Sequence, residues 1–407
     1  MKKELLSPAG NPEKLQAALR YGADAVYLGG MRFGMRAAAD NFSGEELAEA
    51  VRLTHSLGKK LYLTLNTMPR GDEYPALYDF LDEIRPLSVD GVIAADLGVI
   101  SAVKERLPDT PIHISTQASV VSAQAAEAYL RLGARRVVLS RELTFSEIAA
   151  LRAATSKELE LEAFIHGSMC ISYSGRCLIS NHFVGRDANR GACAQPCRWN
   201  YRMYSVAEEK RPDDRLGIEE TDEGTFVFSS KDLCMIHHIP ALMESGIDSF
   251  KIEGRMKSAY YTAVVTNAYR IAMDRYLAAP EAFRNMPELS RELYSVSHRE
   301  YDTGFFFDAP MTDAKVVTDP GYIREKAYIA VATDSDEATG MATFFQKNKI
   351  SSFEEAELLS PGQVGRALNV GQLYDADGEP IDCAPHPKML FRAKVPFPVK
   401  EGDILRQ

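Results

Sequence analysis

The sequence predicts an α/β fold: a (β/α)8 TIM-like barrel with a cysteine-rich insertion, followed by a small C-terminal all-β barrel domain. Three observations support this prediction. The first 280 residues alternate short buried strands with amphipathic helices. These strands number eight, as a closed α/β barrel requires. From about residue 320 only β-like runs occur, with Gly, Asp and Pro turns between them. A doubly wound sheet is the alternative for the first part.

Each predicted unit is a strand, a capped helix and a glycine that ends the helix. The first helix has Asn11 as its expected N-cap and Gly22 as its stop. Two capping boxes are predicted, Ser43 with Glu46 and Thr144 with Glu147. The strands are expected near residues 4–8, 25–29, 61–66, 91–96, 111–117, 136–142, 159–167 and 249–254. A long helix should follow the last strand.

The seventh unit is unusually long. About eighty residues separate the strand that ends near Gly167 from the strand at Phe250, far more than a plain connection needs. Within this insertion, residues 201–206 and 225–229 are expected to form a hairpin. We therefore predict a barrel over residues 1–280 with an insertion at 168–248, a connecting segment at 281–319 and a β domain at 320–407.

Composition limits the classes of function. The chain has 407 residues, of which 45% are hydrophobic, so it is not disordered as a whole. Its 47 basic and 57 acidic residues give a formal charge of -10, and any nucleic-acid site must therefore be a local patch. There is no run of apolar residues long enough for a membrane helix, and no secretory h-region, so we expect a cytoplasmic protein without a membrane partner.

Several barrel strands are polar on one parity. Because the apolar parity must face the helices, the polar one should point into the barrel, where unpaired charge is costly unless it forms a site. The candidate catalytic residues on this parity are Glu162, His166, Lys251 and Glu253. The candidate substrate-binding residues are Asn66, Gln117 and Arg255. The alternative is that Lys251 forms a purely structural buried pair with Glu162 or Glu253.

Cysteines cluster in and around the insertion: Cys170, Cys177, Cys193, Cys197 and Cys234. In a reducing compartment, such clustering indicates metal or redox chemistry rather than disulfides. The spacings match neither a zinc ribbon nor a bacterial ferredoxin, but four thiolates from separate loops suit a cubane Fe–S cluster or a closed zinc site. Arg190 and Arg198 lie among these cysteines. They suit an anionic or stacking ligand, or they offset the charge of the cluster.

The sequence resembles the U32 peptidase, or collagenase-like protease, family. The resemblance rests on residues 162–170 and 174–180, and on residues 6–10, 191–199, 230–234 and 251–255. It implies a prephenate-dependent, oxygen-independent hydroxylase with a 4Fe–4S cluster, because the better-understood members of the family have this activity. A barrel with one small β domain is most similar to the members that convert the wobble uridine of tRNA to 5-hydroxyuridine.

The resemblance also implies roles for particular residues. Cys170, Cys177, Cys193 and Cys234 would ligate the cluster, with Cys197 as the alternate. Lys251 and the arginines would bind the carboxylates of prephenate, a small dicarboxylate, and tRNA would be the macromolecular partner. Three alternatives stay open: a metal-dependent or cysteine peptidase, a 23S rRNA cytidine hydroxylase, and a non-catalytic RNA-binding protein with a structural zinc site.

Overall fold

Eight parallel strands close into a barrel. They are β1 (Glu4–Pro8), β2 (Ala25–Leu28), β3 (Lys60–Leu65), β4 (Gly91–Ala94), β5 (Ile112–Ile114), β6 (Ala134–Val138), β7 (Glu160–Ser168) and β11 (Ser249–Ile252). The ring closes because β11 pairs in parallel with β7 on one side and with β1 on the other. The predicted (β/α)8 barrel is confirmed, and the doubly wound alternative is wrong.

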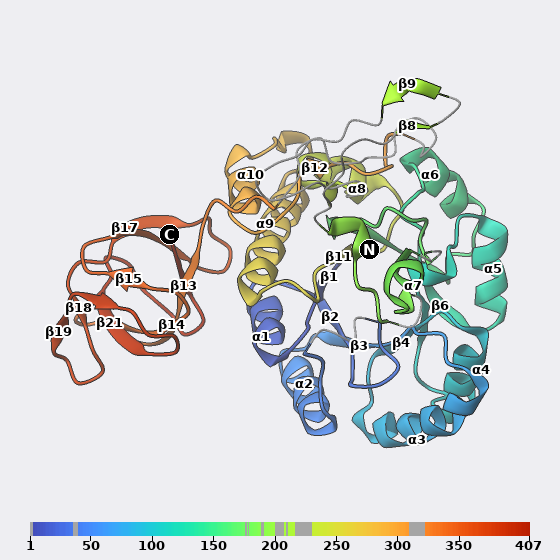
Figure 1. The fold of residues 1–407 in the computed structure, drawn as a ribbon, viewed down its shortest axis with the longest axis horizontal. Helices are drawn as coiled ribbons and strands as arrows, with labels where there is room; N and C mark the ends of the chain where they lie inside the picture. The colour runs from blue at the N-terminus through green and yellow to red at the C-terminus, as the bar shows by residue number, and fades with distance from the viewer. Residues whose placement is uncertain are drawn as a thin grey trace. The chain divides into compact units, whose positions relative to one another are not determined.

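Helices surround these strands, as Figure 1 shows. They include α2 (Gly44–Ser56), α3 (Tyr74–Ile84), α4 (Leu97–Arg106), α5 (Ala123–Arg131) and α6 (Phe145–Ala153). Both predicted capping boxes are present, at the starts of α2 and α6. Each box satisfies backbone N–H groups that a helix start leaves without partners.

This computed structural model describes residues 3–35, 40–175, 177, 179–188, 191–199, 207–208, 211–215, 230–308 and 322–407. Two compact units are distinguished. One comprises Met1–Leu15, Asp24–Met256 and His298–Tyr322, and the other comprises Gln16–Ala23, Lys257–Ser297 and Ile323–Gln407. All the barrel strands belong to the first unit.

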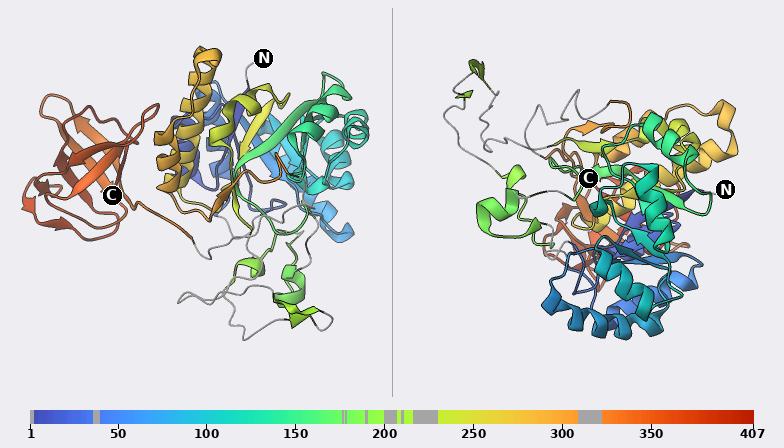
Figure 2. Two further views of the ribbon diagram at one scale, coloured as in Figure 1. Left: turned by 90° about the horizontal axis from the view of Figure 1, so that it is seen from above. Right: turned by 90° about the vertical axis from the view of Figure 1, so that its right-hand side faces the viewer.

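The insertion leaves the barrel from the C-terminal end of β7. Here β10 (Asp232–Cys234) pairs antiparallel with β7, and β12 (Tyr301–Asp302) pairs in parallel with β10. Helix α7 (Ile179–Val184) lies at one end of the barrel, beyond the strand ends (Figure 2). A short antiparallel pair, β8 (Ala207–Glu208) with β9 (Arg211–Arg215), also belongs to the insertion. The predicted hairpin of residues 201–206 and 225–229 lies outside the described residues.

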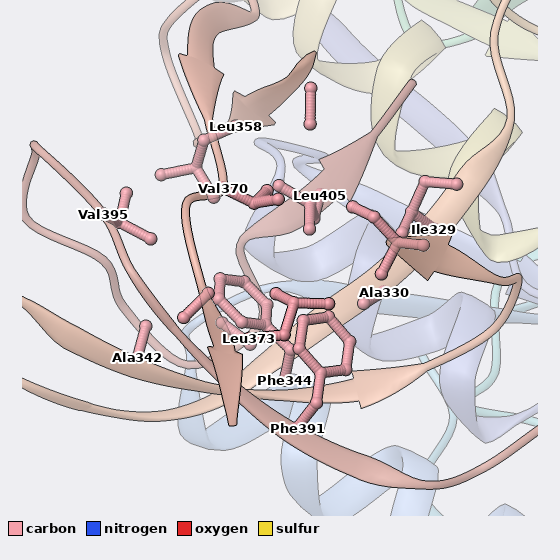
Figure 3. Packing of buried hydrophobic residues seen from close by; sticks show 14 of the residues in the cluster. Ile329, Ala330, Ala342, Phe344, Leu358, Val370, Leu373, Phe391, Val395 and Leu405 are labelled. Carbon is pink, nitrogen blue, oxygen red and sulfur yellow. The ribbon is translucent and has the colours of Figure 1, made fainter. Parts of the chain in front are cut away.

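The second unit contains an antiparallel eight-stranded sheet that forms a half-barrel. Its order is β17 (Arg366–Asn369), β16 (Glu355–Leu359), β22 (Ile404–Arg406), β13 (Tyr328–Asp336), β14 (Met341–Gln346), β21 (Leu390–Lys394), β18 (Leu373–Tyr374) and β19 (Pro380–Ile381). Its core includes stacked Phe344 and Phe391 rings with centroids 5.4 Å apart (Figure 3). The same unit contains α9 (Ala259–Ala278) and α10 (Pro287–Tyr294).

A buried ion pair joins α10 to the last strand of this unit. The Arg406 guanidinium is 1% exposed and donates to Glu292 at 2.7 and 2.8 Å and to Glu357 at 2.6 and 2.9 Å. Two carboxylates therefore compensate one buried cation within the unit. In the described part of the chain, none of the helices is long and apolar enough to cross a membrane.

Candidate functional site

A polar pocket lies at the C-terminal end of the barrel strands. It contains about 480 Å³ of empty space, a figure that includes open solvent. Strands β2 to β7 and β11, or the residues directly after them, contribute to its lining. Barrel enzymes work at this end of the strands, so the pocket is the candidate active site.

The structure brings several predicted site residues together at this pocket: Asn66, Gln117, Lys251, Glu253 and Arg255. Lys251 lies on β11 and the others follow the ends of β3, β5 and β11, and they converge because these strand ends meet at the same end of the barrel. Glu162 and His166 do not line the pocket. Arg190 and the side chain of Arg198 lie outside the described residues. The chemical role of each of these residues stays a prediction.

Glu162 lies inside the barrel and joins two buried cations. It is 0% exposed, accepts a hydrogen bond from Lys251 Nζ at 2.7 Å and accepts another from Arg136 Nη1 at 2.9 Å. Arg136 also donates to Glu4 at 2.6 Å and to Glu160 at 2.7 Å. Burial alone would raise the pKa of Glu162, but Lys251 and Arg136 outweigh it and lower the pKa. Glu162 is therefore a buried carboxylate held ionised by its partners, and it orients Lys251.

Lys251 connects this network to the pocket. Its ammonium group lies 4.4 Å from the ring centroid of Tyr27 and 5.5 Å from that of Phe164, and both of these residues line the pocket. The aromatic rings and the Glu162 carboxylate hold the cation in one place. Lys251 therefore forms a buried ion pair with Glu162 and also lines the candidate site.

His113 belongs to the barrel core rather than to the pocket lining. It is 3% exposed and packs edge-on against Tyr62, with ring centroids 4.5 Å apart. Burial lowers the pKa of His113 well below its usual value, and the positive charges of Arg136 and Lys251 lower it further. His113 is therefore neutral at physiological pH.

Arg255 lines the pocket, and its guanidinium lies close to the backbone at Gly29. Its Nη1 donates to Thr64 Oγ1 at 3.1 Å, and the residue is 3% exposed. A β carbon at Gly29 would lie 2.3 Å from this Nη1, so a larger residue there would displace the guanidinium. Close approach of backbone to a charged side chain is one way in which barrel loops build a site.

Arg141 was not predicted from sequence, although it lines the pocket. It follows β6, and its Nη1 donates to the carbonyl of Ser168 at 2.7 Å. Its guanidinium carbon lies 4.4 Å from the ring centroid of Phe164. The available signal was an arginine three residues after the end of β6, at the end of the barrel where sites occur.

The loop that leads to Cys177 packs against the pocket. Glu142 accepts hydrogen bonds from the backbone N–H of Ser174 at 2.9 Å and from its hydroxyl at 3.0 Å. Gly175 has a φ of 75°, and a β carbon there would collide with the carbonyl of Gln117. Only glycine allows this approach, which places the segment before Cys177 beside a pocket residue.

Another buried ion pair holds the segments that carry Cys170 and Cys234. Arg299 and Asp232 are each 2% exposed, with an Nη2–Oδ1 distance of 2.6 Å. Arg299 Nη2 also donates to the carbonyl of Met169 at 3.1 Å, directly before Cys170, and Asp232 lies two residues before Cys234. This pair fixes the end of β7 and the start of β10 relative to each other.

His166 faces β12 rather than the pocket. Its Nε2 lies 3.5 Å from the Tyr301 hydroxyl, and the two rings have centroids 5.3 Å apart. Across the ladder, His166 is the pairing partner of Cys234. His166 is therefore a neighbour of the cysteine segments.

The cysteines are not gathered into a metal-binding group in this structure. Cys170 is exposed, whereas Cys177, Cys193, Cys197 and Cys234 are half-buried. Among the described residues, no three His, Cys, Asp or Glu side chains lie close enough together to hold a metal ion. The thiolates suit an Fe–S cluster chemically, but the described positions do not form its ligand set.

Comparison with known proteins matches both units. The sequence profile of peptidase family U32 matches residues 10–315, and that of the U32 C-terminal domain matches residues 324–406. A solved structure, the U32 peptidase Mk0906, is 18% identical with a TM-score of 0.41, over 62% of this chain and 94% of that chain.

Several relatives are similar over most of their length. The tRNA hydroxylation protein P1 of Bacillus subtilis is 37% identical over 406 residues, which is 100% of this chain and 95% of the relative. The tRNA hydroxylation protein P of Escherichia coli K12 is 33% identical, over 94% of this chain and 92% of the relative. A collagenase of Porphyromonas gingivalis is 30% identical, over 84% and 82%. The chain belongs to peptidase family U32.

Proposed function

We propose that this protein is an RNA-modifying enzyme that hydroxylates the wobble uridine of tRNA to 5-hydroxyuridine, with prephenate as co-substrate and without oxygen. The observation that carries the proposal is the full-length similarity to a tRNA hydroxylation protein, which spans both units. The 23S rRNA 5-hydroxycytidine C2501 synthase of Escherichia coli is also related, at 36% identity, but the match covers only 39% of that protein. The tRNA reading therefore ranks above the rRNA reading.

The pocket supports a small anionic co-substrate. Three cationic side chains, those of Arg141, Lys251 and Arg255, line it against one acidic side chain, that of Glu253. Arginine binds carboxylates through directional, charge-assisted hydrogen bonds. A dicarboxylate such as prephenate matches this charge.

A peptidase remains the second candidate, because one relative is named a collagenase. The geometry gives it less support. The histidines on the barrel strands, His113 and His166, are both buried, and no histidine among the described residues lines the pocket. A nucleophile in the pocket would need such a base within hydrogen-bonding reach.

Mass spectrometry of tRNA nucleosides tests the proposal. Cells that lack the gene should lose the wobble nucleosides derived from 5-hydroxyuridine, and the wild-type gene should restore them. Unchanged nucleosides in the deletion strain would contradict the proposal. Hydroxycytidine in 23S rRNA from the same cells tests the rRNA alternative, and cleavage of casein or collagen by the purified protein tests the peptidase.

We propose a 4Fe–4S cluster as cofactor, ligated by Cys170, Cys177, Cys193 and Cys234, with Cys197 as the alternate ligand and zinc as the alternative metal. This proposal rests on the chemistry of thiolates and on the family resemblance. Anaerobically purified wild-type protein should be brown and contain iron and sulfide. Cys170→Ala should lose both, whereas Cys383→Ala, in the second compact unit, should keep them. A colourless wild-type protein that contains zinc would contradict the cluster.

A further inference from the structure

Arg141 is held from two sides at the mouth of the barrel. Its Nη1 donates to the carbonyl of Ser168 at 2.7 Å, and its guanidinium carbon lies over the Phe164 ring, 4.4 Å from the ring centroid. A guanidinium that lies over an aromatic ring and has one nitrogen fixed has little freedom to turn away from the pocket. Its position is therefore set before any ligand arrives.

Among the residues that the structure describes, no carboxylate compensates the charge of Arg141. Lys251, another cation of the pocket, has the Glu162 carboxylate at 2.7 Å. For Arg141, the described residues provide a carbonyl oxygen and a distant sulfur but no carboxylate within ion-pair distance. Its Nε is buried and has no hydrogen-bond partner among the described residues. A half-buried cation with an unsatisfied donor is costly unless a ligand supplies the missing anion.

Arg141 also lies where two cavities meet. It lines the polar pocket and a smaller, mostly apolar cavity of about 280 Å³ of empty space. The residues lining the smaller cavity include Met169 and Leu233, which directly precede Cys170 and Cys234. An anionic group bound at Arg141 would thus lie at the boundary nearest the cysteine segments.

We propose that Arg141 is a binding residue of the active site and takes a carboxylate group of the small-molecule co-substrate. The inference rests on the proposed function, which requires an anionic co-substrate in this pocket. A carboxylate supplies both missing features, a negative charge and acceptor oxygens for the unpartnered donor. The pocket lies at the C-terminal end of the barrel strands, where barrel enzymes bind their substrates, and this location favours a small molecule over an RNA phosphate as the source of the anion.

Titration calorimetry with prephenate tests the inference on the full chain. Arg141→Gln should weaken prephenate binding by about 10- to 100-fold, because one charge-assisted interaction is lost. Arg141→Lys keeps the charge but not the planar guanidinium that can donate two parallel hydrogen bonds, so this variant should bind prephenate with intermediate affinity. Arg135→Gln, which changes an exposed arginine on β6, is the matched control and should bind as the wild type does. Affinity for tRNA should be the same for all four proteins.

The outcomes separate this inference from the proposed function. If the wild type neither binds prephenate nor restores the tRNA nucleosides, the proposed function fails and the inference fails with it. If the wild type binds prephenate and Arg141→Gln binds it equally well, only the inference is wrong. Loss of tRNA affinity with unchanged prephenate affinity would assign Arg141 to an RNA phosphate and overturn the inference. If Arg141→Gln melts at a lower temperature than the wild type, Arg141→Lys is the deciding variant. Weaker prephenate binding by Arg141→Lys, with a melting curve like that of the wild type, supports the binding role of Arg141.

Discussion

Glu162 is the carboxylate that two buried cations share inside the barrel. Glu162→Gln keeps the shape of the side chain but removes the charge between Lys251 and Arg136. We expect the free energy of unfolding to fall by about 3–5 kcal/mol, because Lys251 is left as a buried cation without its carboxylate. Chemical denaturation measures this change. Glu158→Gln, at an exposed position before β7, should change stability by less than about 0.5 kcal/mol. Equal stability of both variants would contradict the role of Glu162.

His113 predicts a pH dependence of stability. Its pKa is lowered in the folded barrel, so below the unfolded value of 6.5 the unfolded chain binds a proton that the folded chain does not. Stability should therefore fall as the pH falls below about 6.5, at up to about 1.4 kcal/mol per pH unit for this one group.

The variant His113→Gln isolates this contribution. When the pH is lowered from about 7.5 to about 5.5, its free energy of unfolding should fall by about 1 kcal/mol less than that of the wild type. Urea denaturation at both pH values gives the change in the free energy of unfolding with pH for each protein. The intrinsic cost of the substitution cancels, because only these changes are compared. Identical changes in the wild type and in His113→Gln would show that His113 does not contribute to the pH dependence of stability.

At the residue scale, strand alternation predicted part of the site. It identified Asn66, Lys251 and Glu162, because a polar parity on a buried strand has to face the barrel interior. It missed Arg136, whose exposed neighbour Arg135 hides any alternation, and whose partner Glu4 lies on the first strand. Which distant carboxylate meets a given arginine depends on barrel closure, and the pattern within a strand does not contain that information.

At the scale of elements, Asp232 joins β10 to the exit of β7. Asp232→Asn removes the carboxylate from Arg299, which is 2% exposed and also holds the carbonyl of Met169. We expect a loss of about 3–5 kcal/mol in the free energy of unfolding. If the proposed cluster is bound, iron content should also fall, since Cys170 and Cys234 lie beside these contacts. Asp308→Asn, at an exposed position on the segment after β12, should retain stability and iron. Normal stability and iron in Asp232→Asn would contradict this coupling.

Some secondary-structure elements could be predicted from the sequence, and others could not. The barrel strands and both capping boxes follow from local patterns of burial and side-chain hydrogen bonding, and all are present. Strands β10 and β12 were missed, since runs of three and two residues carry no periodic signal. They exist because β7 extends beyond the barrel and offers a free edge, which is a tertiary cause.

At the scale of the whole molecule, the net charge of -10 and the cationic pocket coexist. Three cations line the candidate site because β6 and β11 end there, whereas the acidic excess belongs to the chain as a whole. The pocket lies entirely in the first compact unit, and the second unit has its own buried core and its own buried ion pairs. Ligand binding in the pocket and the stability of the half-barrel can therefore be measured separately.

Phe344→Ala tests this separation. Phe344 is 0% exposed and stacks on Phe391 in the centre of the half-barrel. Removing the ring should lower the free energy of unfolding of the second unit by about 3–5 kcal/mol, through lost burial and the cavity left behind. Calorimetric melting should show the transition of that unit at a lower temperature. Below that transition, prephenate should bind as tightly as to the wild type, because no pocket residue belongs to the second unit. Parallel loss of prephenate binding would show that the pocket depends on the half-barrel.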